Sequence, residues 1–204
     1  PPLAEDEMMR QLEIVCRVLG EIGAKVDKTC GLHVHHHIDD FTVEDVKNLY
    51  RLYFKHTLAI EAIMPNSRRA SSNPSYCRGI TEEMLREIEM YQTIRDIACA
   101  FSRYHVINMK AYLKYGTVEF RQHSGTIDFT KIANWLKITQ ALVATAKRAK
   151  QVKPLSEAAK RTAWSREIAM IRELGLSETE QSAYYIARKK EFAELNRTAY
   201  NMAG

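Results

Sequence analysis

The sequence lacks the features that mark several large classes of protein. Its 204 residues hold no apolar run near the roughly 18 residues that a membrane-spanning helix needs. The common phosphate-cradling loops, G-x-x-x-x-G-K-S/T and G-x-G-x-x-G, are absent, and so is the G-x-S-x-G elbow of serine hydrolases. The four cysteines have no C-x-x-C spacing, so we expect free thiols in a reducing, cytoplasmic setting rather than disulfides.

What is present is ordinary for a single globular domain with a sizeable core. Hydrophobic residues make up 46% of the sequence and charged residues 27%. The formal net charge of +5 comes from 30 basic and 25 acidic residues, which are scattered along the chain. This modest excess of positive charge permits an anionic substrate, and we expect neither a nucleic acid nor a membrane as partner.

One short stretch concentrates histidines at alternate positions. Three of the seven histidines, His33, His35 and His37, are separated by the single residues Val34 and His36 and flanked by Leu32 and Ile38. Alternation with a period of two predicts a β-strand, so these three imidazoles share one face of it. His36 points to the opposite face, where we expect a structural role.

A second stretch, residues 117–123, has the same character. Glu119, Arg121 and His123 alternate with Val118 and Phe120, so the ionisable side chains are predicted on one face and the apolar ones on the other. Two strands that each have an apolar back and an ionisable front indicate a sheet whose polar face is a functional site.

Two readings of these ionisable groups stay open on spacing alone. His33 and His35 with Glu119 could chelate a divalent ion, or the histidines could be hydrogen-bonded structural groups. Glu119 and Arg121 could be a buried ion pair. Alternatively, the carboxylate binds a cation and the guanidinium binds a phosphate or a developing negative charge.

A polar loop between two expected helices carries paired arginines. Arg68 and Arg69 precede a Ser/Asn-rich stretch that ends near Cys77. Paired arginines in a loop are usually solvated, but guanidinium groups also match phosphate and carboxylate bidentately. Loops of this length in compact domains are often functional.

The pattern of the whole chain predicts the α+β class. The expected helices cover residues 5–22, 42–64, 81–102, 132–146 and the charged sequence beyond 154, and the expected strands cover 32–38, 104–109 and 117–123. Three strands are few for a sheet that carries a site. Either further strands lie in ambiguous stretches, or part of the sheet lies outside this chain.

Four stretches together resemble the amidoligases, a family of glutamine synthetase-like carboxylate–amine ligases. The stretches are Cys30–His35, Met64–Arg69 with Tyr76-Cys77, Arg103-Tyr104 with Asn108, and Gly116–Thr126. They fall within residues 1 to about 150. We therefore expect a C-terminal portion of the catalytic domain at 1–153 and a helical C-terminal extension at 154–204.

The resemblance implies ATP-dependent formation of an amide bond through an acyl phosphate, with Mg²⁺ or Mn²⁺ holding the nucleotide against a curved antiparallel sheet. The substrates would be a small-molecule or peptide carboxylate and an amine. The site residues that the resemblance implies are His33 and Glu119 for the metal, Arg121, Arg68 and Arg69 for catalysis, and His35, Asn108 and His123, again with Arg121, for the nucleotide.

One departure from the family pattern concerns the start of the chain. Family members carry an N-terminal strand with a Glu-x-Glu pair that completes the metal sites, whereas this sequence begins at Pro1-Pro2-Leu3. We expect a preceding segment or a companion chain to supply that strand, and this chain to be part of the complete enzyme.

Two other functions compete with the ligase. A metal-dependent hydrolase could use the H-x-H strand, although a barrel of the amidohydrolase type needs about 250 residues and eight strands. A non-catalytic helical interaction module would use residues 155–204 as its contact surface.

Overall fold

The computed structural model describes residues 5–27, 29–70 and 75–202, which form an α+β fold, as the sequence predicts. The strands are β1 (Val34–His37), β2 (Ile107–Asn108) and β3 (Thr117–Phe120). The helices are α1 (Glu5–Glu21), α2 (Val43–Glu61), the 3-10 turn η1 (Asn66–Arg68), α3 (Glu82–Met90), α4 (Ile94–Ala100), α5 (Lys110–Tyr115), α6 (Phe129–Arg148), α7 (Glu157–Lys160), α8 (Ala163–Glu173) and α9 (Glu178–Met202).

The described strands form one antiparallel sheet in the order β1-β3-β2, so β3 lies in the middle. On one side His35 is the register partner of Glu119, and on the other side Asn108 is. Glu119 therefore stands between two polar residues from strands that are far apart in the sequence. Directly opposed residues on neighbouring strands lie close enough for their side chains to interact.

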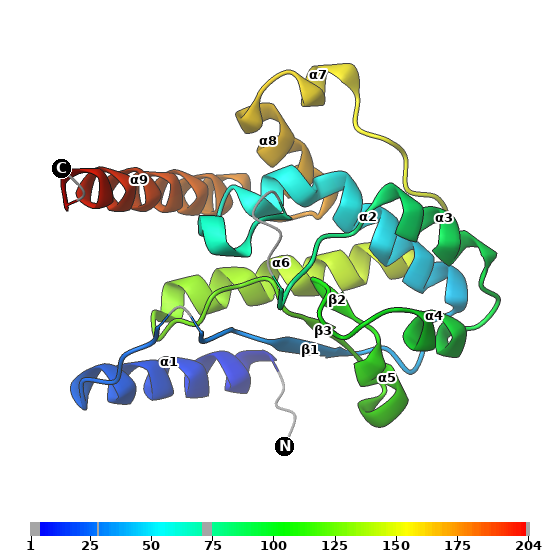
Figure 1. The fold of residues 1–204 in the computed structure, drawn as a ribbon, viewed down its shortest axis with the longest axis horizontal. Helices are drawn as coiled ribbons and strands as arrows, with labels where there is room; N and C mark the ends of the chain where they lie inside the picture. Colours follow the sequence, from blue (N-terminus) through cyan, green and yellow to red (C-terminus); the bar gives the residue numbers. More distant parts are fainter. Residues whose placement is uncertain (1–4, 28, 71–74, 203–204) are drawn as a thin grey trace.

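Helix α6 covers the apolar face of this sheet (Figure 1). Val118 and Phe120 are fully buried there. The His36 ring meets Phe120 edge-on, and its Nε2 lies 2.9 Å from the hydroxyl of Thr139 on α6. Burial lowers the pKa of His36 to about 4, so the imidazole is neutral at pH 7. The structural role expected for His36 is confirmed.

Helix α2 begins where its sequence predicts. Thr42 and Asp45 form a reciprocal capping box, in which the Thr42 hydroxyl accepts from the Asp45 amide and the Asp45 carboxylate accepts from the Thr42 amide. The helix then buries a stripe of large side chains that includes Tyr53 and Ile60. This stripe packs against α6 and α8, so α2 is the central helix of the core.

The C-terminal segment after residue 154 is helical, as expected, and shares the core of the rest. Met170 and Ile171 of α8 and Tyr185 of α9 are fully buried in the same hydrophobic cluster as the sheet. Helix α9 then runs outward to the C-terminus (Figure 1). The polar ties of this segment to α2 include Glu173, whose carboxylate lies 2.6 Å from Lys55 and 2.8 Å from His56.

The single helix predicted over 81–102 is wrong: the structure has two, α3 and α4. Tyr91 is extended (φ −76°, ψ 142°) and ends α3. Thr93 then caps α4 by accepting from the Asp96 amide at 3.1 Å. The strand predicted over 104–109 is also shorter than expected, because only Ile107 and Asn108 pair with β3 before the short helix α5 begins.

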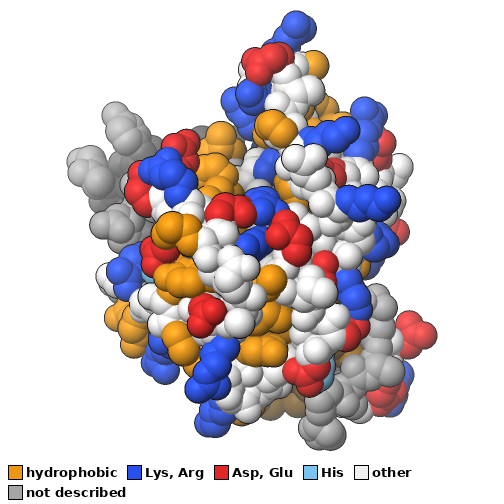
Figure 2. All heavy atoms as spheres, turned by 90° about the vertical axis from the view of Figure 1, so that its right-hand side faces the viewer, with side chains coloured by type: hydrophobic (Ala, Val, Ile, Leu, Met, Phe, Trp, Pro, Cys, Tyr) orange, Lys and Arg blue, Asp and Glu red, His pale blue; other side chains and the backbone are white. Residues whose placement is uncertain are grey.

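None of the described helices is both long and apolar enough to cross a membrane. Figure 2 shows the face over α3, α4 and α5, where acidic and basic side chains are interspersed with hydrophobic ones. The structure thus agrees with the scattered charge of the sequence on this face.

Candidate functional site

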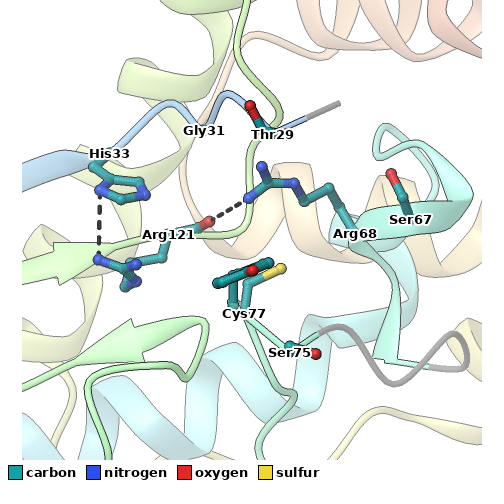
Figure 3. Close-up of a pocket in the computed structure, with 9 residues that line it drawn as sticks. Thr29, Gly31, His33, Ser67, Arg68, Ser75, Cys77 and Arg121 are labelled. Atoms are coloured by element: carbon teal, nitrogen blue, oxygen red, sulfur yellow. Dashed lines mark hydrogen bonds between the residues drawn. The ribbon is translucent and has the colours of Figure 1, made fainter. Parts of the chain in front are cut away.

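A cavity of about 580 Å³ opens between the polar face of the sheet and the loop that carries the paired arginines (Figure 3). Segments that are distant in the sequence meet there. The lining residues are Thr29, Gly31, His33, Ser67, Arg68, Ser75, Tyr76, Cys77 and Arg121. Two guanidinium groups and one imidazole in the wall of one cavity favour an anionic ligand.

Glu119 is the centre of the polar cluster beside this cavity and is 6% exposed. Its Oε1 lies 2.9 Å from His33 Nδ1 and 2.7 Å from Arg121 Nη1. Its Oε2 accepts a hydrogen bond from the Asn108 side-chain amide. His35 stands further off, with Nε2 3.8 Å from Oε1. The two strands thus bring together the imidazoles and the carboxylate that alternation predicted on one face.

His33 precedes β1 and presents its ring to both Glu119 and the cavity. Burial lowers its pKa, and the Arg121 charge lowers it further, although the Glu119 carboxylate opposes this. Its Nδ1 is also 3.4 Å from Arg121 Nη1, but a guanidinium can only donate. The shorter contact therefore assigns the proton of the neutral ring to Nδ1, donated to Glu119, and leaves a lone pair on Nε2.

Gly31 leaves room beside its backbone for the side chains of both His33 and Arg68. A Cβ at position 31 would lie 3.0 Å from His33 Nε2 and 3.3 Å from Arg68 Nη1. Any larger residue would push these two side chains apart. The glycine in the Cys-Gly-Leu-His stretch thus has a packing reason at the mouth of the cavity.

Arg121 and Arg68 form two walls of the cavity. The Arg121 side chain is 11% exposed, and its Nε is buried without a hydrogen-bond partner among the described residues. Arg68 is 7% exposed, and its Nη2 donates to the Cys30 carbonyl at 2.7 Å. Its Nη1 lies 3.5 Å from the Arg121 carbonyl, the contact drawn in Figure 3. Backbone contacts thus fix the plane of the Arg68 guanidinium.

Arg69, the second arginine for which the resemblance implied a catalytic role, is not among the residues that line this cavity. Its Nε donates to the Met64 carbonyl at 2.9 Å, and its guanidinium lies 5.7 Å from the Phe192 ring of α9. Arg68 is the last residue of the 3-10 turn and Arg69 follows it in the extended conformation (φ −94°, ψ 146°), and only one of the two side chains lines the cavity. Arg68 is that residue.

His123 does not share the polar face either, which corrects the predicted alternation. It is fully buried, with its ring 5.6 Å from that of Trp135 on the α6 side, and its Nδ1 donates to the Ser124 carbonyl. Regular pairing ends at Phe120, after which the consecutive residues Gln122 and His123 are both buried. Burial lowers the pKa of His123 to about 4, and His123 is not among the residues that line the cavity.

The other predicted residues lie near Glu119 or at the surface. His35 is on the polar face, with Nδ1 2.9 Å from the Thr117 hydroxyl. His37 lies further along β1, exposed, with Nε2 3.2 Å from Asp39. Asn108 is buried and directly bonded to Glu119.

Sequence reasoning missed the buried pair Tyr53 and Gln122. The Tyr53 hydroxyl donates to Gln122 Oε1 at 2.5 Å, and Gln122 Nε2 donates to the Arg68 carbonyl at 3.0 Å. Gln122 itself was a signal, because it follows Val118 and Phe120 at alternate positions, and an amide on that predicted apolar face must find partners when it is buried. It also missed Cys77, which is buried in the cavity wall, where burial raises the pKa of its thiol.

The donors present fit a metal that shares its coordination with a substrate. In the described part of the chain no group of three or more His, Cys, Asp or Glu side chains is arranged to hold a metal ion. His33 Nδ1 and Glu119 Oε1 nevertheless lie 2.9 Å apart, so an ion that displaced the proton between them could take one nitrogen and one oxygen donor from this pair. Mg²⁺ is commonly bound by one or two carboxylates together with water and substrate phosphates, so this pair suits such an ion better than a closed structural site.

Comparison with known proteins assigns the family. Residues 1–143 match the family model described as "Putative amidoligase enzyme". Because the match covers more than half of the chain, the protein belongs to this amidoligase family. No curated protein and no solved structure matches it. The matched residues include Glu119, His33 and both arginines of the cavity.

Proposed function

We propose that this protein is an ATP-dependent carboxylate–amine ligase that forms an amide bond through an acyl phosphate. The observation that carries the proposal is the cluster in which Glu119 lies within 2.9 Å of both His33 and Arg121 at the wall of a cavity that Arg68 also lines. Membership of the amidoligase family supports amide-bond formation as the reaction class.

The reaction has two steps. A carboxylate oxygen of the acid attacks the γ-phosphorus of ATP, the bond to the β–γ bridging oxygen breaks, and ADP leaves. The amine nitrogen then attacks the acyl carbon, the bond to the phosphate oxygen breaks, and the extra proton of the nitrogen passes to a base or to water. Both steps gather negative charge, so positioning and charge neutralisation are the main catalytic tasks.

The residues of the cavity suit these tasks. His33 and Glu119 would hold Mg²⁺ or Mn²⁺, which neutralises phosphate charge when bound. Arg121 is fixed by Glu119 through Nη1, while its buried Nε has no partner among the described residues. We assign Arg121 to the transferring phosphoryl group and Arg68 to an anionic group of the acid or the nucleotide. His35 and Asn108 would contact the nucleotide or orient the Glu119 carboxylate.

The test is a trapping assay. The protein is incubated with ATP, Mg²⁺ and pools of carboxylic acids or peptides in the presence of hydroxylamine, which converts an acyl phosphate into a hydroxamate. We expect phosphate release and hydroxamate that depend on both the acid and the metal. Glu119→Gln should remove both signals, while Glu157→Gln should keep them, because Glu157 is exposed on α7 and bonds only Lys160 among the described contacts.

Calorimetry supplies an independent arm. Wild-type protein should bind Mg²⁺ with a non-hydrolysable ATP analogue, and Glu119→Gln should weaken this binding. A wild-type protein that binds no nucleotide with either Mg²⁺ or Mn²⁺ would contradict the proposal.

A further inference from the structure

The loop that carries Arg68 is held from behind by helix α9. Arg188 of α9 is 4% exposed, and it donates to the Ile63 carbonyl from Nε at 3.3 Å and from Nη2 at 3.1 Å. This carbonyl lies just after the end of α2, where helix carbonyls lack partners within the helix. Two bonds from one buried guanidinium thus fix the point at which the chain leaves α2 for the loop.

A second contact from α9 holds the next turn of the same loop. The ring of Phe192 lies 4.3 Å from the Arg188 guanidinium and 5.7 Å from that of Arg69. Arg69 in turn donates to the Met64 carbonyl at 2.9 Å. Guanidinium groups are attracted to aromatic faces, so Phe192 joins α9 to the loop through both arginines.

The charge of Arg188 is itself paired. Its Nη1 donates to the Glu191 carboxylate on the same helix, and the other oxygen of Glu191 lies 2.7 Å from Lys131 Nζ on α6. These contacts with Glu191 and, through it, with Lys131 orient the Arg188 guanidinium independently of the loop. Bonds from such an oriented, charged donor are stronger than those between neutral groups.

The segment after β3 and the last residue of α2 supply further contacts to the loop. Gln122 donates to the Arg68 carbonyl at 3.0 Å, and the Ala70 amide donates to Glu61 at 2.6 Å. The backbone of the loop is thus tied at residues 63, 64, 68 and 70, and the Arg68 side chain projects from it into the cavity wall. Rigid backbone support of this kind holds a side chain in one place.

We propose that α9, which lies outside the family-matched residues 1–143, is a clamp that positions Arg68, with Arg188 and Phe192 as its positioning residues. The kinetic consequence rests on the proposed ligase function, whereas the structural consequence does not. Loss of the clamp should loosen residues 63–70 and let the Arg68 guanidinium leave the position that it holds beside Gly31.

The experiment compares two positions on the same helix. Arg188→Gln removes the bonds to the loop. Lys189→Gln, the matched control, removes an ion pair with the fully buried Glu167 of α8 and should therefore destabilise the fold without touching the loop. Arg188→Lys and Phe192→Leu are milder variants of the clamp, in case Arg188→Gln fails to fold. Melting temperatures show that each variant is folded at the assay temperature.

Two readouts keep the proposals separate. Hydrogen–deuterium exchange of a peptide covering residues 63–70 measures the loop directly, and the trapping assay measures kcat and KM. In Arg188→Gln we expect exchange to be faster and kcat to be lower, each by about tenfold or more, for the loss of charge-assisted bonds. Lys189→Gln should lower the melting temperature and leave both readouts near wild type, and Arg188→Lys should recover part of the loss.

The outcomes are distinct. Equal exchange of residues 63–70 in Arg188→Gln and Lys189→Gln would overturn the clamp, whatever the activity. Faster exchange in Arg188→Gln alone, with no trapping signal from wild type, would support the clamp while the ligase proposal fails.

Discussion

Asn108 on β2 donates its side-chain amide to Glu119 Oε2, and the two residues are register partners across the sheet. The Asn108 oxygen accepts from the Lys110 amide at 2.9 Å, so the amide is oriented with its nitrogen toward the carboxylate. One oxygen of Glu119 is thus fixed by a neutral donor, while Oε1 faces His33 and Arg121. Contacts of this kind orient a metal ligand without binding the metal.

Asn108→Ala should therefore weaken the binding of the metal more than it weakens the fold. We expect the Mg²⁺ concentration for half-maximal ATP turnover to rise by about 10- to 100-fold. Titration of Mg²⁺ in the trapping assay measures this shift. An unchanged Mg²⁺ requirement in a folded Asn108→Ala protein would mean that this amide does not orient a metal ligand.

His33 and His37 lie four residues apart, on the face that alternation predicted for both, and form a matched pair for mutation. His33 lies 2.9 Å from Glu119, whereas His37 is exposed and meets Asp39 at 3.2 Å. His33→Ala should lower kcat/KM for ligation by about 100-fold or more, because removing a charge-stabilising group at a reacting centre commonly costs that much. His37→Ala should stay near wild type. Similar activities for the two variants would remove His33 from the site.

Gly116 lies at the turn between α5 and β3, and its backbone conformation can be tested by mutation. It ends α5 in the left-handed region (φ 64°), and a Cβ there would meet the Asp39 carboxylate. Gly116→Ala should cost about 1–2 kcal/mol of unfolding free energy from the backbone alone. Gly20→Ala is the control, because nothing lies within 4 Å of a Cβ in that helical position. We expect it to stabilise the protein by up to about 1 kcal/mol in urea titrations.

The buried His123 predicts how stability depends on pH. Its pKa is lowered from 6.5 to about 4 in the folded protein, so the unfolded chain takes up a proton first as the pH falls. The stability that the neutral ring contributes is present above pH 6.5 and is lost between about pH 6.5 and 4, by about 2 kcal/mol between pH 7 and 5. His123→Gln should flatten the slope of unfolding free energy against pH in this window. An equal slope in wild type and His123→Gln would contradict the burial argument.

The sequence predicted the centre of the site because alternation is a local rule. A period of two places His35 within β1, His33 just before it and Glu119 within β3, and antiparallel pairing then brings the two strands together. The start of α2 was predictable for the same reason, since the capping box of Thr42 and Asp45 involves neighbouring residues only.

The misses came from contacts across the fold. Nothing in the dipeptide says whether Arg68 or Arg69 faces the sheet, because Phe192 and the Met64 carbonyl decide it. His123 was assigned to the polar face because its strand was taken to continue regularly, whereas regular pairing ends at Phe120 and resumes at the bridge between Gly31 and Ser124 with a shift of one residue. The break between α3 and α4 was the one miss with a local signal: Thr93 followed three residues later by an acidic residue is a helix start.

The hydrogen bond between His36 and Thr139 lies on the apolar face of the sheet, but it also affects the arrangement of the polar face. Side chains alternate, so a shift of β1 by one residue would turn Val34 toward Glu119 and bury a neighbouring imidazole against α6. Because Thr139 of α6 binds the His36 ring, the register of β1 is fixed. That register determines which side chains of β1 face the Glu119 carboxylate. A shift in the register of β1 would therefore cost the contact with α6 on the apolar face, as well as disturb the cluster around Glu119 on the polar face.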